Sequence, residues 1–316
     1  MKILNSIKSL TQVYKKMSNC GKILLFVALL LIIVVFFKSI NFPQNKLKVE
    51  GFETSNKFLF KNNNDVYDDF YASIYDYLVF NTLKNDYEIG NITNITKPDK
   101  TSVILDIGCG TGHHVNDLSK KNLNITGIDI SPSMIKEAKK TYPDCNFKVG
   151  DALDEMQFSH NMFTHILCLY FTIYYLKDKR RFFDNCMDWL APGGYLVVHL
   201  VDREKFDPIL PPGNPLYIVS PQKYAKERIT KTKVTFNEFT YESNFKFDKS
   251  NDVAIFDEKF KFDDGKVRKQ EQTLYMEDTE DILTIAQECG FILSGKLDLV
   301  KCAYEYQYLY IFTKPN

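Results

Sequence analysis

Three glycines directly follow a strand-like segment about one third of the way along the chain, and this arrangement is suited to ligand binding. Residues 102–107 form a short, mainly aliphatic run that predicts a strand covered on both faces. Gly108, Gly110 and Gly112 then allow a sharp backbone turn with no Cβ between the main chain and a ligand. The next segment predicts a helix whose free N–H groups face the turn. Such a crevice, at the carboxyl end of a strand, suits a flat, polar small molecule.

The glycine spacing and the acid before the turn narrow the choice of ligand. A dinucleotide-binding turn requires G-x-G-x-x-G, whereas here the pattern is G-x-G-x-G and His113 stands where the last glycine would fall. Asp106, two residues before the first glycine, would repel a pyrophosphate but suits a ligand with a cationic amino group. The turn therefore disfavours a nicotinamide-dependent oxidoreductase, which we retain as an alternative.

Carboxylates also follow the next two predicted strands. Strand and helix patterns alternate for about a hundred residues from Val103, which predicts βαβ units and a parallel sheet. Asp129 ends the strand predicted at 124–130 and is placed to accept both hydroxyls of a ribose. Asp151 and Ala152 follow the third strand, and a Pro-Gly-Gly turn precedes the fifth strand, predicted at 195–200.

Taken in order, these four signals resemble the class I S-adenosylmethionine-dependent methyltransferases, in their small-molecule branch, over residues 65–202 and 277–316. The resemblance implies S-adenosyl-L-methionine as the cofactor and no metal. It also implies a Rossmann-like α/β fold with a seven-stranded, mostly parallel sheet and an antiparallel last strand. The residues that it implies at the cofactor are Asp106, Gly108, Cys109, Gly110, Gly112, Asp129, Ile130, Asp151, Ala152, Leu169, Tyr71 and Tyr170.

Two side chains are candidates for a direct part in methyl transfer, an in-line displacement in which alignment and exclusion of water are the main tasks. Tyr75 and Tyr71 lie in an amphipathic helical pattern at 67–78, which resembles the helix that such methyltransferases place over the cofactor; core packing is the alternative and is compatible with it. His199, near the end of the fifth strand, is the candidate general base. A histidine that is simply satisfied at a strand end is the alternative.

Composition excludes some classes of partner. Lys+Arg and Asp+Glu both number 40, so no overall positive field recruits nucleic acid, and we expect no nucleic-acid partner. The seven cysteines contain no C-x-x-C pair and no metal-ligand spacing. They favour a reducing environment for the folded domain.

The amino-terminal region predicts a membrane anchor. A basic tail at 1–22 precedes fifteen consecutive apolar residues, and snorkelling lysines at both ends extend this run to a single-pass transmembrane helix at 23–40. No small-residue cleavage site follows, which disfavours a cleaved signal peptide. We expect a linker at 41–62 and the catalytic domain at 63–316, on the cytosolic side of a membrane, although the charges leave the orientation open.

Residues 203–275 change from helical to alternating patterns, which predicts an antiparallel β insertion over one end of the domain. The hypothesis from the sequence is thus a membrane-anchored methyltransferase for a small-molecule acceptor. A lipid acceptor is the second choice because of the anchor, and a protein acceptor stays open. A catalytically silent scaffold at a membrane is the alternative from another functional class.

Overall fold

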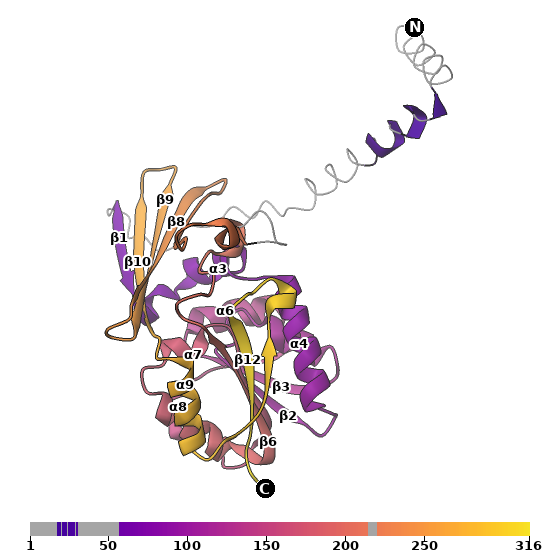
Figure 1. Ribbon diagram of the computed structural model, residues 1–316, viewed down its shortest axis with the longest axis vertical. Helices are drawn as coiled ribbons and strands as arrows, with labels where there is room; N and C mark the ends of the chain where they lie inside the picture. Colours follow the sequence, from indigo (N-terminus) through magenta and orange to yellow (C-terminus); the bar gives the residue numbers. More distant parts are fainter. Residues whose placement is uncertain (1–17, 20, 24, 29, 31–56, 214–219) are drawn as a thin grey trace. The chain divides into compact units, whose positions relative to one another are not determined.

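The computed structural model describes residues 18, 19, 21–23, 25–28, 30, 57–213 and 220–316. The chain divides into two units, Met1–Lys48 and Val49–Asn316. In the first unit, the described residues from 19 onward are helical. The second unit holds two β-sheets and the helices that cover them (Figure 1).

The first sheet has seven strands in the order β11-β12-β6-β5-β2-β3-β4. Neighbouring strands from β6 to β4 are parallel, whereas β12 runs antiparallel to both β6 and β11. The parallel arrangement brings the carboxyl ends of β2, β3, β4 and β5 to one edge of the sheet. The strands are β2 (Val103–Ile107), β3 (Asn124–Asp129), β4 (Asn146–Val149), β5 (Phe163–Cys168), β6 (Leu190–Val201), β11 (Ile292–Asp298) and β12 (Gln307–Thr313).

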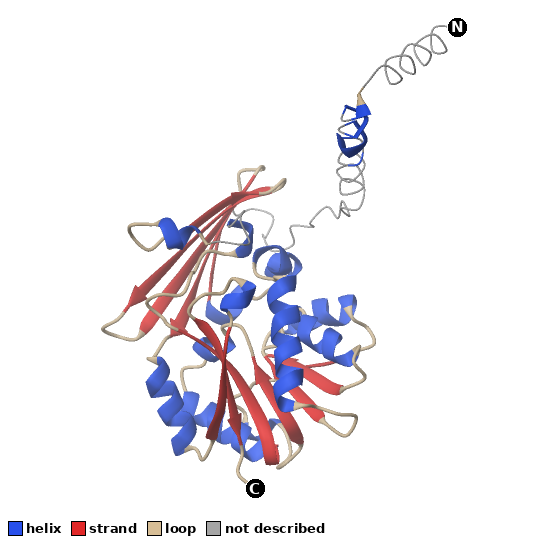
Figure 2. Cartoon of the chain, turned by 45° about the vertical axis from the view of Figure 1, so that its right-hand side comes forward, coloured by secondary structure: helices blue, strands red, loops and turns tan. Residues whose placement is uncertain are grey.

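Helices cover both faces of this sheet (Figure 2). Leu105 and Ile107 of β2 share one buried cluster with the apolar residues of α8 and α9, whereas Ile104 shares the other with those of α4, α5 and α6. Alternate side chains of one strand thus enter opposite cores, as expected for a parallel sheet buried on both sides. The helices are α4 (Thr82–Thr96), α5 (His113–Ser119), α6 (Pro132–Thr141), α7 (Thr172–Tyr175), α8 (Lys179–Trp189) and α9 (Thr279–Glu288).

The second sheet has five strands in the order β1-β10-β9-β8-β7. Its β8, β9 and β10 form antiparallel hairpins, and α3 (Asp69–Leu78) packs against it through edge-to-face contacts of Phe70 with Phe260 and Phe262. This contact joins α3 to the second sheet. The strands are β1 (Phe58–Asn62), β7 (Lys231–Thr235), β8 (Phe239–Asp248), β9 (Val253–Phe262) and β10 (Val267–Tyr275).

The predicted fold class needs two corrections. The second sheet is mixed rather than antiparallel, because β1, from residues 58–62 of the predicted linker, pairs in parallel with β10. The predicted transmembrane helix at 23–40 is wrong: among the residues that the structure describes, no helix is long and apolar enough to cross a membrane. Positions 24, 29 and 31–40 of that prediction lie outside the described residues. The apolar run has only fifteen residues, about 22 Å of helix against roughly 30 Å of hydrocarbon.

The membrane localisation and the membrane partner were inferred from that helix alone, so both predictions are withdrawn with it.

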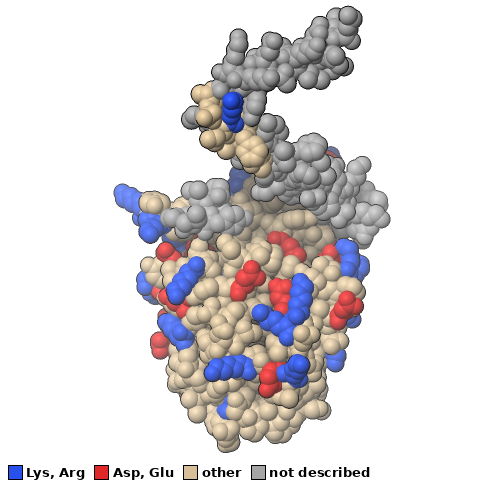
Figure 3. All heavy atoms as spheres, turned by 90° about the vertical axis from the view of Figure 1, so that its right-hand side faces the viewer, with Lys and Arg blue, Asp and Glu red and all other residues tan. Residues whose placement is uncertain are grey.

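Charged side chains of both signs are interspersed on the face of the molecule drawn in Figure 3. No large field of one sign covers that face, and its charges therefore give no reason to place a nucleic acid or an anionic surface there.

Candidate active site

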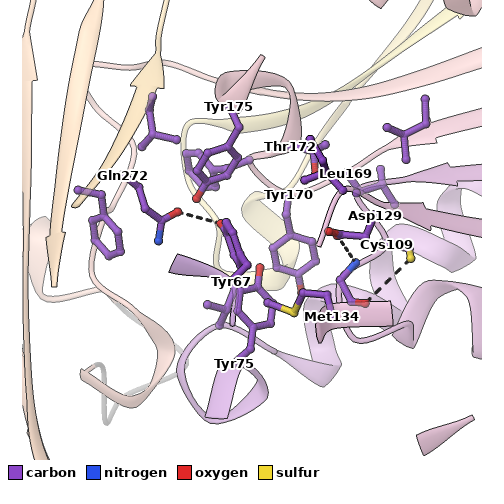
Figure 4. Close-up of a pocket in the computed structure, with 18 of the residues that line it drawn as sticks. Tyr67, Tyr75, Cys109, Asp129, Met134, Leu169, Tyr170, Thr172, Tyr175 and Gln272 are labelled. Carbon is purple, nitrogen blue, oxygen red and sulfur yellow. Dashed lines mark hydrogen bonds between the residues drawn. The ribbon is translucent and has the colours of Figure 1, made fainter. Parts of the chain in front are cut away.

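A cavity of about 530 Å³ lies at the carboxyl edge of the first sheet, and α3, α7 and the second sheet contribute to its walls (Figure 4). Of the residues predicted at the cofactor, all except Gly112 line this cavity. Tyr75 also lines it, whereas His199 does not. The structure therefore brings together side chains from β2, β3, α3 and the segment after β5 that are far apart in the sequence.

The glycine turn forms one wall, and its backbone requires glycine. Gly108, Gly110 and Gly112 all have positive φ, at +69°, +53° and +91°. A Cβ on Gly112 would lie 2.5 Å from the Phe147 ring, so this glycine serves close packing of β4 and α6 against the turn. A Cβ on Gly110 would meet only Tyr75, at 3.8 Å. The open space beside Gly110 belongs to the cavity.

The three predicted carboxylates face this one cavity but differ in what they bind within the protein. Asp129 accepts the backbone N–H groups of Gly110 and Ser131, with N···O distances of 3.0 and 2.8 Å. Asp151 accepts the N–H of Leu153 at 2.8 Å. Asp106 is only 2% exposed, and its buried Oδ2 has no hydrogen-bond partner.

The solitary position of Asp106 has an electrostatic consequence. Burial raises the pKa of this carboxyl to about 6, and the charges of Asp129 and Glu88 add to the rise against an opposing effect of His114. A buried carboxylate without a partner is costly, and a cationic group brought next to it would relieve that cost. Asp106 is thus suited to bind a ligand ammonium group.

The tyrosines predicted over the cofactor come from two elements. Tyr71 and Tyr75 lie on α3, which begins at the N-cap Asp68, and Tyr170 follows β5 with a left-handed φ of +50°. Burial raises the pKa of all three phenols well above the ordinary value, so each is neutral near pH 7. Tyr75 can therefore contact and orient a ligand but is not a ready proton acceptor.

His199 lies behind the cavity wall. Its side chain is fully buried and its Nδ1 pairs with the main-chain oxygen of Tyr170. Burial, together with the nearby charge of Lys84, lowers the pKa of the imidazole to about 4, so the ring is neutral at physiological pH. The general-base role stays a prediction, and the observed contact places His199 as a support for the turn that carries Tyr170.

A buried ion pair next to Tyr170 was not predicted from the sequence. Lys84 Nζ lies 2.5 Å from Glu88 Oε1 and 3.5 Å from the centre of the Tyr170 ring, and His114 Nε2 lies 3.3 Å from Glu88 Oε2. Burial raises the pKa of Glu88, but Lys84 and His114 outweigh it and lower the pKa to about 2. The i,i+4 spacing of the pair on α4 was the available signal, but it does not indicate burial.

A second unpredicted contact fastens α3 to the glycine turn. Asp76 accepts a hydrogen bond from Thr111 Oγ1 at 2.6 Å, and its other oxygen lies 2.9 Å from His113 Nε2. His113 Nδ1 is 2.8 Å from the Tyr142 hydroxyl, and the Phe80 ring stacks on the imidazole. His113 thus occupies the position of the missing third glycine and holds the helix that supplies Tyr71 and Tyr75.

The part of the cavity next to the second sheet is here called the lid compartment. One polar contact in this compartment is a hydrogen bond from the Tyr67 hydroxyl to Gln272 Oε1, at 2.8 Å (Figure 4). None of its residues was predicted as part of the site. The residues that define the compartment are Tyr67, Tyr175, Phe206, Phe245, Phe256, Gln272 and Leu274.

The comparison with protein families bears directly on this geometry. Residues 104–194 match a family described as "Methyltransferase domain". This segment is similar to a methyltransferase domain. It contains the glycine turn, Asp129 and Asp151, so the predicted likeness to class I S-adenosylmethionine-dependent methyltransferases is confirmed, as is S-adenosylmethionine as the cofactor of such a domain. The alternative of a nicotinamide-dependent oxidoreductase finds no support in these comparisons.

Among known proteins, the chain is similar to dTDP-4-amino-2,3,4,6-tetradeoxy-D-glucose N,N-dimethyltransferase of Saccharopolyspora spinosa, with 30% identity over 146 residues. The alignment covers 44% of this chain and 57% of that protein. The chain thus spans little more than half the length of this relative, so the likeness does not extend over that whole enzyme.

Two solved structures share the fold. A S-adenosylmethionine-dependent methyltransferase from Clostridium acetobutylicum has a TM-score of 0.59 at 19% identity, over 78% of this chain and 98% of that one. A SAM-bound amino pentose methyltransferase from Micromonospora echinaspora has a TM-score of 0.51 at 18% identity, over 73% and 91%. At this identity the likeness shows the fold alone, and it does not identify a substrate.

Proposed function

We propose that this chain transfers a methyl group from S-adenosylmethionine to a small-molecule acceptor held in the lid compartment. The observation that carries the proposal is the buried, unpartnered oxygen of Asp106 inside the cavity. An ammonium group is the partner that this oxygen lacks, and S-adenosylmethionine carries one on its amino-acid end.

The other residues that would hold the cofactor follow from the same wall of the cavity. Asp129 keeps free lone pairs after its two backbone contacts and would accept the ribose hydroxyls. Asp151, Ala152 and Ile130 lie farther along the edge and would surround the adenine. When bound, S-adenosylmethionine supplies a methyl group that is already activated on a sulfonium sulfur.

The chain then has two tasks, which are to align the acceptor with that methyl group and to exclude water. Tyr75, Tyr170 and Tyr67 offer neutral aromatic surfaces next to the turn, and aromatic faces attract a sulfonium cation. Phe206 and Phe245, which the second sheet and the loop before it contribute, close the lid compartment with apolar surface. The relative from S. spinosa is named for an amino sugar, which supports an amine as the acceptor group here.

Calorimetric titration of the full chain with S-adenosylhomocysteine, the expected product, tests the proposal. We expect binding by the wild type and a loss of roughly ten-fold or more in affinity for Asp106→Asn, which keeps the shape but removes the charge. Asp144→Asn, an exposed acid outside the cavity, is the matched control and should bind like the wild type.

Two outcomes would contradict it. Lack of S-adenosylhomocysteine binding by a folded wild-type chain would favour the catalytically silent scaffold. Equal affinity of the Asp106→Asn and wild-type chains would mean that the ammonium group lies elsewhere.

A further inference from the structure

Four tyrosines meet between the glycine turn and the lid compartment, and are here called the tyrosine cage: Tyr67, Tyr71, Tyr75 and Tyr175. The Tyr67 ring is central, with its centre 5.6, 6.4 and 6.1 Å from those of Tyr71, Tyr75 and Tyr175, each edge-on. All four rings line the cavity. Several aromatic surfaces directed at one space are the arrangement that proteins use to bind organic cations.

A buried carboxylate behind the cage strengthens this character. Glu258 of β9 is 2% exposed and accepts hydrogen bonds from the hydroxyls of Tyr71 and Tyr241 and from the amides of Gln270 and Gln272. Burial raises the pKa of this carboxyl, and the four hydrogen-bond donors oppose that rise because they stabilise its ionised form. Because Tyr71 donates to this negative charge, its ring becomes a better electrostatic partner for a cation.

The same contacts turn the phenol groups away from an acceptor. The Tyr71 hydroxyl is engaged by Glu258 at 3.0 Å, and the Tyr67 hydroxyl by Gln272, whose amide also donates to Glu258. The cage is thereby fixed to the inner face of the second sheet. In Tyr67 and Tyr71 the hydroxyls are thus engaged by the second sheet, which leaves their rings to contact an acceptor.

The charged residues that line the cavity also favour a cationic ligand over an anionic one. The described residues that line the cavity include one lysine, Lys177, and no arginine, and their acidic members outnumber it five to one. A phosphate or carboxylate on the acceptor would enter this negative field with Lys177 as the one lysine among the described lining residues, which is unfavourable. The acidic residues are Asp76, Asp106, Asp129, Asp151 and Asp207.

Building on the proposed function, we propose that the acceptor is a cationic amine without phosphate or carboxylate groups, recognised by the tyrosine cage. This differs from the S. spinosa relative, whose name specifies a dTDP-linked sugar and hence an anionic diphosphate. The ammonium group loses a proton to water before transfer. The nitrogen lone pair then forms the new N–C bond as the C–S bond of the sulfonium breaks, and the bonding pair stays on sulfur.

Three probes of similar size but different charge test the acceptor class. Phenethylamine, 2-phenylethanol and phenylacetate are titrated calorimetrically into the full chain saturated with S-adenosylhomocysteine, and dTDP serves as the nucleotide probe. We expect phenethylammonium to bind roughly ten-fold or more tightly than the alcohol, because cation–π attraction and the acidic lining act only on the cation. Phenylacetate and dTDP should bind more weakly than the alcohol.

The inference would be overturned if phenylacetate or dTDP bound as tightly as the amine, or if the chain showed no preference among the probes. The proposed function would still stand in that case, provided that S-adenosylhomocysteine binds. Failure of S-adenosylhomocysteine itself to bind would contradict both.

Substitutions at Tyr67 distinguish the contribution of its ring to acceptor binding from that of its hydroxyl. Tyr67→Leu removes the central ring and should weaken phenethylammonium binding roughly ten-fold, whereas Tyr67→Phe keeps the ring and should stay within about three-fold of the wild type. Tyr77→Leu is the control, because Tyr77 lies on α3, which carries Tyr71 and Tyr75 of the cage, but is 55% exposed and outside the cavity. Equal losses in Tyr67→Phe and Tyr67→Leu would show that the hydroxyl, and not the ring, recognises the acceptor, and would refute the cage.

Discussion

The two ends of the cavity are built in different ways. At the cofactor end, consecutive βα units contribute a backbone turn and short carboxylates, and each residue lies within a few positions of a strand end. The lid compartment instead combines Tyr67, Tyr175, Phe206 and Gln272, from segments up to about two hundred residues apart. The cofactor end is therefore a property of local geometry, and the lid compartment is a property of how two sheets pack.

This difference separates the tasks of the two ends. Backbone geometry at the glycine turn leaves little freedom to change, because a side chain at Gly108 or Gly112 would collide with its neighbours and Gly110 has a positive φ. The lid compartment consists of side chains on a separate sheet, and exchanging them alters the acceptor space without disturbing the turn. A shared domain can thus bind one cofactor while its acceptor differs from that of its relatives.

The largest effect should come from the turn itself. Gly112→Ala would place a Cβ 2.5 Å from the Phe147 ring at φ +91°, and we expect the free energy of unfolding to fall by about 2 to 5 kcal/mol. Gly110→Ala has the same sign of φ but no close neighbour, so it should cost only about 1 to 2 kcal/mol. Urea unfolding of both variants measures the difference, and equal losses would show that packing against Phe147 is unimportant.

The next prediction tests whether the two ends of the cavity bind cofactor and acceptor separately. Asp129→Ala should weaken S-adenosylhomocysteine binding by about 1.5 to 3 kcal/mol, since charge-assisted contacts to the ribose are lost. Calorimetry on this variant and on Gln272→Ala, a lid residue, provides the comparison. If Gln272→Ala costs as much cofactor affinity as Asp129→Ala, the two ends are not separate sites.

The sequence could predict which residues meet at the carboxyl edge of the first sheet because its signals are local, and their role at the cofactor stays a prediction. Asp106, the glycines, Asp129 and Asp151 are each recognisable from their position after a strand pattern, and all except Gly112 line the cavity. Gly112 serves packing instead, which depends on Phe147, a neighbour that spacing does not reveal.

The lid compartment was not predictable in the same way. The alternation in residues 203–275 indicated strands, but neither the parallel addition of β1 nor the packing of Phe70 on that sheet follows from any local pattern. Both depend on contacts between segments about two hundred residues apart. The transmembrane prediction failed for the opposite reason, because it relied on local hydrophobicity alone.

A third prediction concerns stability at the cofactor end. The pKa of Asp106 is raised to about 6 in the folded protein, so the folded state binds protons more readily than the unfolded state and loses stability as pH rises from about 4 to above 6. Asp106→Asn should therefore stabilise the ligand-free protein at pH 7.5, by on the order of 2 kcal/mol.

The gain from Asp106→Asn should shrink to a small fraction near pH 4, where the wild-type carboxyl is protonated in the folded state and about half protonated in the unfolded state. Thermal unfolding of the variant and the wild type at pH 4, 6 and 7.5 checks this. A gain that is independent of pH would show that the charge of Asp106 is not its source.

The smallest effect should come from the contact that couples the two ends. At its amino end α3 is held to the second sheet by Asp68, which accepts two hydrogen bonds from Arg268, and near its carboxyl end Asp76 holds it to the glycine turn. Asp76→Asn keeps an acceptor for Thr111 but removes the charge facing His113. Because this pair is partly exposed, we expect the free energy of unfolding to fall by only about 0.5 to 1 kcal/mol.

Since Asp76 anchors Tyr75 over the turn, S-adenosylhomocysteine affinity should fall slightly while the preference for phenethylammonium over the alcohol is retained. A loss of that preference without a change in cofactor affinity would show that α3 belongs to the lid compartment rather than to both ends.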